Sequence, residues 1–239
     1  MRKKIIAGNW KMNYCVNKAE DFVSEIKDAI NTDEVDVVIC PNFVSLDRIS
    51  DLLDGTNIKL GAQNVHTEDK GAYTGETSVN MLAAVGVKYC IVGHSERRQD
   101  QKESDEEIHD KVERLFEAGI TPILCCGETK EEREEGREKE VIGRELDIAL
   151  NGISEEDKAR VIIAYEPIWS IGTGLIPTNN QIIDIIEFIK SKYNCKVLYG
   201  GSANDTNIDD LKQCSCIDGY LLGGLSLKPE NLKVFVNKL

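Results

Sequence analysis

Residues 161–201 read VIIAYEPIWSIGTGLIPTNNQIIDIIEFIKSKYNCKVLYGG and contain two predicted strands around one predicted helix. Val161–Tyr165 and Lys196–Tyr199 are short apolar runs without polar alternation, which is typical of strands buried on both faces. Between them, residues 178–192 place isoleucines at helical spacing, and Thr178 stands where an N-cap is expected. A strand, a helix and a second strand in this order indicate a parallel β-sheet.

The same alternation recurs along the rest of the chain. Residues 17–30 and 104–118 have apolar side chains at helical spacing, and Gly119 is a candidate C-cap for the second segment. Six further apolar runs read as strands: Ile5–Gly8, Val35–Cys40, Ile58–Ala62, Tyr89–Val92, Pro122–Cys126 and Tyr220–Leu222. Eight strands alternating with helices predict an α/β fold, a (β/α)8 barrel forming a single domain over residues 1–239.

A doubly wound open sheet is the rival to the barrel. Such a sheet usually carries a glycine-rich fingerprint after its first strand. Here the first predicted strand is followed by Asn9-Trp10-Lys11-Met12-Asn13, which is not a glycine-rich loop. The sequence therefore favours the closed barrel, whose usual size of about 250 residues is close to the length of this chain.

The charge balance excludes several classes of partner. The chain of 239 residues carries 29 Lys and Arg against 42 Asp and Glu, a net charge of −13. Nucleic acid and anionic membranes both reward a basic surface, so neither is expected as a partner. No apolar stretch approaches the roughly 20 residues that span a bilayer, and the apolar run at the N-terminus is too short for a signal peptide. The cytoplasm is the expected compartment.

The cysteines are expected to be small residues of the hydrophobic core rather than ligands of a metal site. Without an export signal, the eight cysteines are expected to be reduced thiols rather than four disulfides. Cys214-x-Cys216 and the Cys125-Cys126 pair lack the spacing of a zinc site and have no nearby histidine. The highly charged run at residues 128–140 is interpreted as a solvated helical surface with i,i+4 ion pairs.

Polar residues that follow the strands matter most, because active sites of such barrels lie at the carboxyl ends of the strands. Lys11 follows the first strand, as either a surface charge or a cation aimed into the barrel mouth. His94 follows the fourth strand and precedes a predicted helix, so it is either structural or catalytic. A helix N-terminus beside His94 is expected to lower its pKa, and the neutral ring can donate an N–H to a substrate oxygen.

Glu166 directly follows an apolar run that is expected to be buried. A charged side chain is rare in such surroundings, so Glu166 is expected to have a functional role. Pro167 restricts Glu166 to extended backbone angles and so directs the carboxylate. The segment Gly172-Thr173-Gly174 beyond it has the composition of a mobile loop tip. A carboxylate at the root of a loop that can close suggests a general base in a site that excludes water. The alternative is an ordinary glycine-containing loop.

Glycine pairs follow the last two predicted strands. They occur in Tyr199-Gly200-Gly201-Ser202 and in Leu222-Gly223-Gly224. Glycine lets backbone N–H groups approach an anion, and barrels often bind phosphate at these two loops. A phosphate cradle, a carboxylate base, a histidine and a lysine suit abstraction of a proton next to the carbonyl of a small phosphorylated sugar.

In these motifs the chain resembles the triosephosphate isomerase family, and the match covers the whole chain in order. The matching segments are Asn9-x-Lys11, GAQNVH at 61–66, GAYTGE at 71–76, GHSERR at 93–98, YEPIWSIGTG at 165–174, YGGS at 199–202 and Gly223-Gly224. The segment at 165–174 is highly specific by itself. The resemblance implies interconversion of glyceraldehyde 3-phosphate and dihydroxyacetone phosphate in glycolysis and gluconeogenesis.

The resemblance also implies roles for individual residues. Glu166 is then the base that moves the proton, and His94 the neutral electrophile that polarises the carbonyl. Lys11, placed with the help of Asn9, adds positive charge beside the developing oxyanion, and Glu96 pairs with Lys11. Phosphate is expected to bind the backbone of Gly172, Ser202, Gly223 and Gly224. No cofactor and no metal are implied.

In assembly, the resemblance implies a homodimer in which the loop of residues 64–78 enters the neighbouring subunit. Thr74 lies near the tip of that loop, and Cys15 is expected close to the partner. The alternative to an active enzyme is a catalytically silent barrel retained as a phosphate-binding or interaction protein. Such a barrel is expected to have lost Lys11, His94 or Glu166, and all three are present.

Overall fold

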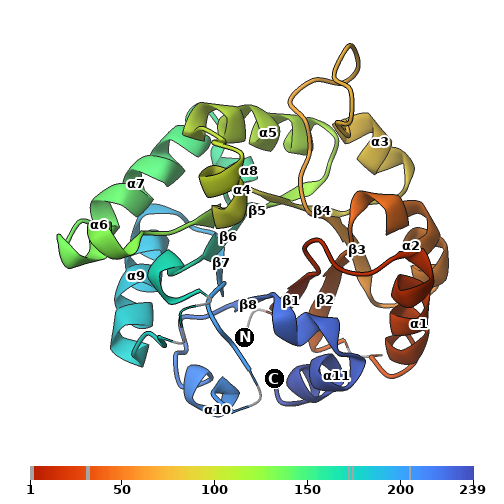
Figure 1. Cartoon of the computed structure of the whole chain (residues 1–239). Coiled ribbons are helices and arrows are strands. Elements are labelled where there is room, and N and C mark those ends of the chain that lie inside the picture. The colour runs from red at the N-terminus through yellow and green to blue at the C-terminus, as the bar shows by residue number, and fades with distance from the viewer. Residues whose placement is uncertain (1–2, 31–32, 172, 174, 205) are drawn as a thin grey trace.

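The computed structural model describes residues 3–30, 33–171, 173, 175–204 and 206–239. Within these residues, eight parallel strands close into a barrel in chain order, because β1 pairs with both β2 and β8 (Figure 1). The strands are β1 Lys4–Asn9, β2 Val35–Cys40, β3 Lys59–Ala62, β4 Tyr89–Val92, β5 Thr121–Cys126, β6 Ile162–Tyr165, β7 Lys196–Tyr199 and β8 Gly219–Leu222. The predicted barrel is confirmed.

Helices cover the outside of the barrel (Figure 1). The α-helices are α1 Val16–Ile26, α2 Leu46–Leu53, α3 Val79–Ala84, α4 Ser95–Asp100, α5 Asp105–Glu117, α6 Lys130–Glu134, α7 Glu138–Ala149, α8 Glu155–Lys158, α9 Asn179–Lys192, α10 Ile208–Leu211 and α11 Pro229–Asn237. Short 3-10 turns are η1 Phe43–Ser45, η2 Ile168–Ser170 and η3 Gly224–Leu227.

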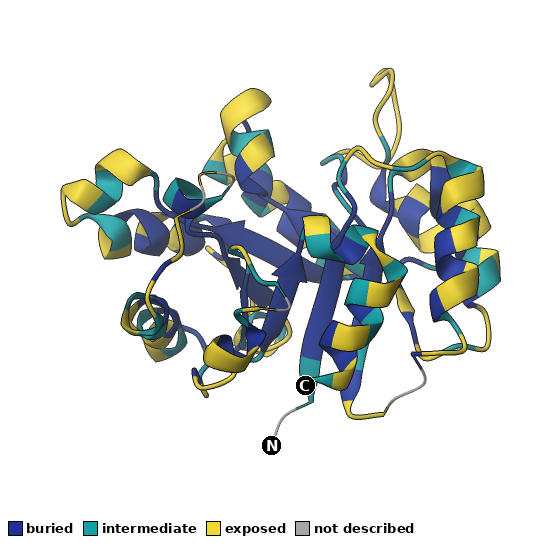
Figure 2. Ribbon diagram, turned by 60° about the horizontal axis from the view of Figure 1, so that its bottom comes forward, coloured by how far each residue is buried: buried dark blue, intermediate teal, exposed yellow. Residues whose placement is uncertain are grey.

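The strands are buried on both faces, as their continuous apolar runs predict. Ile5 and Ala7 belong to a cluster made of strand residues alone, which fills the inside of the barrel. Ile6, between them, points the other way and joins the larger cluster that includes Phe22 of α1 and Ile49 of α2. Figure 2 shows the buried strands in dark blue, with yellow exposed residues on the outer faces of the helices. The two-residue period of a strand therefore divides one apolar run between two cores.

Predicted element ends agree closely with the structure. Every predicted strand matches an observed strand to within one residue at each end. Thr178 caps α9 as predicted, because its side chain accepts the backbone N–H of Gln181. The helix predicted for residues 17–30 is shorter, since α1 ends at Ile26. The carbonyl of Ile26 accepts the N–H groups of both Ala29 and Ile30, so a turn replaces the last helical residues.

The charged run at residues 128–140 differs from its interpretation at one position. Most of it forms α6 and the start of α7 on the surface, and Gly136 adopts a φ of 70° between the two helices. Glu128, however, is completely buried. The prediction of a solvated surface is therefore wrong for Glu128, which several donors hold beneath the barrel rim.

The loop between β3 and α3 projects away from the barrel, at the upper right of Figure 1 and the top of Figure 2. Residues 68–76 within this loop are all exposed. None of the eight cysteines, all of which lie in the described part of the chain, is joined in a disulfide. Among the described residues, no helix is both long enough and apolar enough to cross a membrane.

Candidate active site

A pocket of about 310 Å³ lies at the carboxyl ends of the strands. It brings together the predicted catalytic and phosphate-binding groups from loops far apart in the sequence. Glu96 instead lines an adjoining pocket, which shares Asn9, Lys11 and His94 with the first. Gly172 lies outside the described residues. The lining of the first pocket is Asn9, Lys11, His94, Glu166, Ile171, Gly200, Gly201, Ser202, Ala203, Leu221, Gly223, Gly224 and Leu225.

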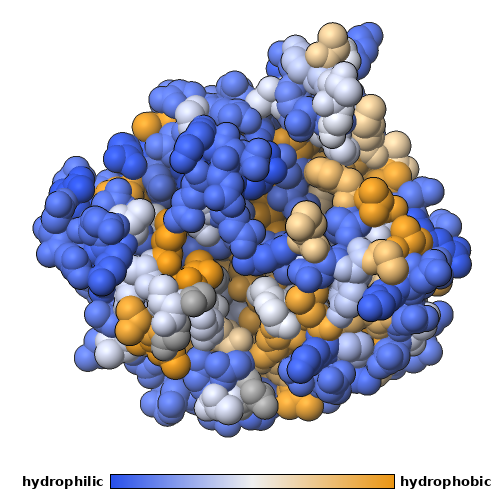
Figure 3. Space-filling model, viewed as in Figure 1, coloured by the Kyte–Doolittle hydropathy of each residue, from blue (hydrophilic) through white to orange (hydrophobic). Residues whose placement is uncertain are grey.

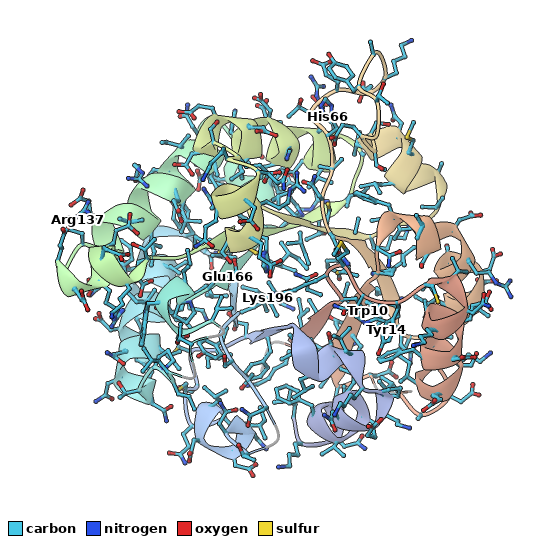
Figure 4. The ribbon with its side chains drawn as sticks, viewed as in Figure 1. Trp10, Tyr14, His66, Arg137, Glu166 and Lys196 are labelled. Carbon is cyan, nitrogen blue, oxygen red and sulfur yellow. The ribbon has the colours of Figure 1, made fainter. Side chains whose placement is uncertain are left out.

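Glu166 follows β6 directly and is 2% exposed. Its backbone N–H donates to the carbonyl of Cys126 at 2.8 Å, which extends the pairing of β5 with β6 by one residue. Its carboxylate accepts the N–H of Ser95 at 3.0 Å and lies 2.9 Å from Nε2 of His94. Gly200 leaves room for this side chain, because a Cβ there would lie 3.0 Å from Cγ of Glu166. Figure 4 places Glu166 over the centre of the barrel.

His94 is the N-cap of α4. Its Nδ1 accepts the backbone N–H of Glu96 at 3.2 Å, so Nδ1 carries no proton. The proton of a neutral ring then sits on Nε2, which faces Glu166. The start of α4 thus selects the tautomer that can donate from Nε2 into the pocket.

Glu166 and His94 perturb each other. Burial favours the neutral acid, but His94, the Ser95 N–H and Lys11 together lower the pKa of Glu166. Burial also opposes charge on His94, but the neighbouring Glu166 carboxylate outweighs burial and raises the pKa of His94. The expectation of a lowered His94 pKa is therefore wrong while the two side chains face each other, because a carboxylate in contact exceeds the effect of a helix N-terminus.

Lys11 adopts an unusual backbone conformation with a φ of 53°. The side chain of Asn9 compensates by accepting the Lys11 N–H at 3.0 Å, and so holds this turn at the end of β1. The Lys11 ammonium donates to Glu96 at 2.5 Å. Its aliphatic stem passes Gly223, where a Cβ would lie 3.6 Å from Cε. Asn9 therefore places Lys11, and Glu96 orients its charge.

The loops after β7 and β8 form the opposite wall of the pocket. Gly200, Gly201 and Ser202 follow β7, while Gly223 precedes η3. Apart from its two chain neighbours, no described residue has an atom within 4 Å of the position that a Cβ on Gly224 would take, so its backbone is open. At Gly224 the backbone is therefore accessible to an anion without a side chain in the way.

The sequence profile of triosephosphate isomerase matches residues 4–239. The chain belongs to the triosephosphate isomerase family. It is 43% identical to the triosephosphate isomerase of Clostridium beijerinckii, over 99% of this chain and 100% of that relative. It is 44% identical to that of Alkaliphilus oremlandii over the same shares, and 42% identical to that of Clostridium tetani over 99% of this chain and 97% of the relative.

In this member of the triosephosphate isomerase family, a buried carboxylate supports the segment that leads from Glu166. Glu128 Oε1 accepts from the hydroxyl of Tyr165 at 3.0 Å, from the indole N–H of Trp169 at 2.7 Å and from Arg133 at 2.8 Å. Arg133 also lies over the Trp169 ring at 5.2 Å. Sequence reasoning missed this cluster, because Glu128 stands at the head of a charged run.

Metal-ligating atoms come together elsewhere in the described part of this family member. His109, Asp110 and Glu113 approach one another on the outer side of α5, and both carboxylates are exposed. His109 Nδ1 lies 3.2 Å from the carbonyl oxygen of Ala149, which can only accept, so this contact is a hydrogen bond when Nδ1 carries the proton. None of the three lines the pocket at the barrel mouth. The pocket itself offers a lysine, a histidine and a single carboxylate, a set suited to proton transfer.

Proposed function

We propose that this member of the triosephosphate isomerase family interconverts D-glyceraldehyde 3-phosphate and dihydroxyacetone phosphate, with Glu166 as the base. The observation that carries the assignment is the placing of the Glu166 carboxylate and His94 Nε2 2.9 Å apart in one pocket with Lys11. Because both groups face the same pocket, a three-carbon sugar bound there can meet the base at a carbon-bound proton and the His94 N–H at the neighbouring oxygen.

In the proposed reaction the substrate carbonyl oxygen replaces Glu166 as the acceptor of the His94 Nε2 proton. Glu166 is ionised at neutral pH, because its neighbours lower its pKa. It removes a proton from the carbon next to the carbonyl, and the electron pair moves onto the carbonyl oxygen to give an enediolate. His94 and Lys11 stabilise the negative oxygen. Through His94 Nε2, the former carbonyl oxygen gains a proton and the neighbouring hydroxyl oxygen loses one, and the new carbonyl forms there as Glu166 returns its proton to the other carbon, so no atom is gained or lost.

The phosphate is proposed to bind the backbone groups of Ser202, Gly223 and Gly224, together with Gly172. The open space beside Gly224, and the position of Gly223 next to Lys11 in the same pocket, support this assignment. Tyr199 and Ser202 are proposed to hold the loop after β6 when it closes over the substrate. The Tyr199 hydroxyl is buried and has no partner among the described residues, which leaves it available for that contact.

A silent barrel retained as a binding protein is not favoured. The chain aligns over nearly its whole length with triosephosphate isomerases, at 43% and 44% identity. It also retains Lys11, His94 and Glu166. The deciding experiment measures conversion of glyceraldehyde 3-phosphate by the purified protein and by its Glu166→Gln variant. We expect rapid turnover in the parent and a loss of at least about a hundredfold in the variant.

A matched control is Glu140→Gln, which neutralises an exposed carboxylate on α7. The control is expected to retain the activity of the parent. A folded parent without turnover contradicts the proposal, and a Glu166→Gln variant as active as the parent contradicts the assigned base.

We also propose that the chain forms a homodimer through the loop of residues 64–78. The loop reaches away from its own barrel, and large apolar side chains near it are exposed, with Met12 at 96% and Met81 at 56%. Figure 3 shows orange surface below this loop. Exposed apolar area of this kind marks an interaction surface.

The dimer is tested by sedimentation of the parent and of Thr74→Glu, which places a charge near the loop tip. We expect a dimer for the parent and a smaller species for the variant, because a buried unpaired charge opposes association. Glu140→Lys, on the other side of the barrel, serves as the control. A monomeric parent at micromolar concentration counts against the dimer.

We place the enzyme in the cytoplasm, where thiols stay reduced. The six buried cysteines, none of which is in a disulfide, fit such a compartment. Because the reaction is reversible, the enzyme is proposed to serve both glycolysis and gluconeogenesis. Fractionation of the source cells, followed by an activity assay of each fraction, tests the location.

A further inference from the structure

Glu145 on α7 is a buried carboxylate that the proposed reaction does not use. It is 6% exposed and accepts the backbone N–H of Gly127 at 3.1 Å. Gly127 is the first residue after β5, at the carboxyl end of the barrel. The helix outside the barrel therefore holds a peptide group at its catalytic rim.

Gly127 lies against the backbone of the base. A Cβ on Gly127 would lie 1.7 Å from the carbonyl oxygen of Glu166, so the backbone segments after β5 and after β6 are in contact at this point. The Glu166 N–H also bonds to Cys126, the neighbour of Gly127. A shift of the Gly127 peptide therefore moves the backbone from which the catalytic carboxylate projects.

The other oxygen of Glu145 faces a cation that reaches the second catalytic strand. Glu145 Oε1 lies 3.7 Å from Nη1 of Arg98. Arg98 donates from Nε to the carbonyl of Gly93 at 2.8 Å and from Nη2 to the carbonyl of Cys125 at 3.3 Å. Gly93 directly precedes His94. One carboxylate thus bonds to the end of β5 at Gly127 and approaches the end of β4 through Arg98, which Asp105 also holds.

We propose that Glu145 is a positioning residue, which holds the Gly127 peptide directly and the Gly93 carbonyl through Arg98, and so maintains the distance between Glu166 and His94. The proposal rests on the reaction proposed above and adds a residue that does not touch the substrate. An acceptor at this position satisfies a buried N–H. The Glu145 carboxyl group also faces Arg98, a cation whose side chain is only 13% exposed.

The proposal predicts a difference between variants that keep the acceptor and variants that lose it. Glu145→Leu removes it, and Glu145→Asp shortens the side chain by one methylene so that it falls short of Gly127. Both are expected to lower kcat about tenfold while KM stays within about twofold, because the phosphate loops lie elsewhere. Glu145→Gln keeps an amide oxygen for Gly127 and is expected to restore kcat to within about twofold of the parent. Glu140→Gln on the exposed side of α7 is the control.

A second measurement does not depend on turnover. Amide hydrogen exchange, followed by NMR, compares the Glu166 N–H with the Ile39 N–H in β2. We expect Glu145→Asp to reduce protection at Glu166 by about tenfold while protection at Ile39 stays the same. If Glu145 has a merely structural role, the protection of both amides falls alike, and that result overturns the proposal.

The outcomes separate this inference from the proposed function. Unchanged kcat in folded Glu145→Leu and Glu145→Asp overturns the inference even when the parent is fully active. Equal losses in Glu145→Gln and Glu145→Leu also overturn it, because the acceptor is then not the cause. A parent without turnover contradicts the proposed function, and the exchange measurement still decides the role of Glu145.

Discussion

Glu145→Gln is expected to reduce the pH dependence of stability. Burial raises the pKa of Glu145 to about 7 from an ordinary 4.5, although Arg98 and the Gly127 N–H favour the charged form. The groups facing this carboxyl are Arg98 on α4, Asp105 at the start of α5 and Arg144 on α7 itself. Burial thus exceeds the stabilisation by the nearby cations.

The sign of the effect follows from the proton balance of the two states. Between the unfolded pKa of 4.5 and the folded pKa of about 7, the folded protein holds more of this proton than the unfolded chain. Stability therefore falls as pH rises through this window, and the full loss is present above it. A shift of 7 − 4.5 = 2.5 units at about 1.4 kcal/mol per unit amounts to about 3 kcal/mol.

Urea unfolding of parent and variant at pH 5 and pH 8, at one fixed protein concentration, measures this change. The tryptophans report unfolding by fluorescence. The variant cannot ionise at this position, so its stability relative to the parent is expected to rise by about 2.5 kcal/mol between the two pH values, the rest of the effect lying below pH 5. The comparison uses the change with pH, because any cost of an amide facing Arg98 is the same at both. Equal pH dependence in the two proteins refutes the reasoning.

Three further outcomes are expected. Gly127→Ala introduces a methyl group that would clash with the Glu166 carbonyl oxygen, so the backbone that carries the base must shift. We expect kcat to fall at least about a hundredfold in steady-state assays while the circular dichroism spectrum stays native. Asn9→Ala removes the acceptor that holds the Lys11 turn, and kcat/KM is expected to drop about tenfold. A bulky thiol reagent at exposed Cys15 should dissociate the proposed dimer in sedimentation experiments. Full loss of activity with Cys15 unmodified, by mass spectrometry, contradicts this last expectation.

The strands could be predicted because their signal is local. A run such as Val161–Tyr165 is short and apolar at every position, which is typical of a strand covered on both faces. The cap at Thr178 is equally local, since its partner lies three residues away. The end of α1 was less certain, because residues 27–30 continue the apolar spacing although hydrogen bonds to Ile26 already close the helix.

The candidate site was predicted where a residue's chemistry and its place after a strand coincide. Glu166 and His94 both stand at such positions, and the structure brings them to 2.9 Å. The pKa of His94 was predicted with the wrong sign, since the sequence does not show that Glu166 faces it. Glu128 was assigned to the surface because its neighbours in the chain are charged.

By itself the sequence determined the eight-fold alternation of strands and helices, the order of the motifs and the residue types that can move a proton. Only the tertiary structure decided which groups face one another. Glu145 reaches Gly127 across 18 residues, and Glu166 reaches Ser95 across 71. Such contacts depend on how the barrel closes. Closure results from many weak packing contacts throughout the core, so no local sequence pattern predicts which residues will meet. For the same reason, buried carboxylates such as Glu128 and Glu145 are visible only once the fold is known.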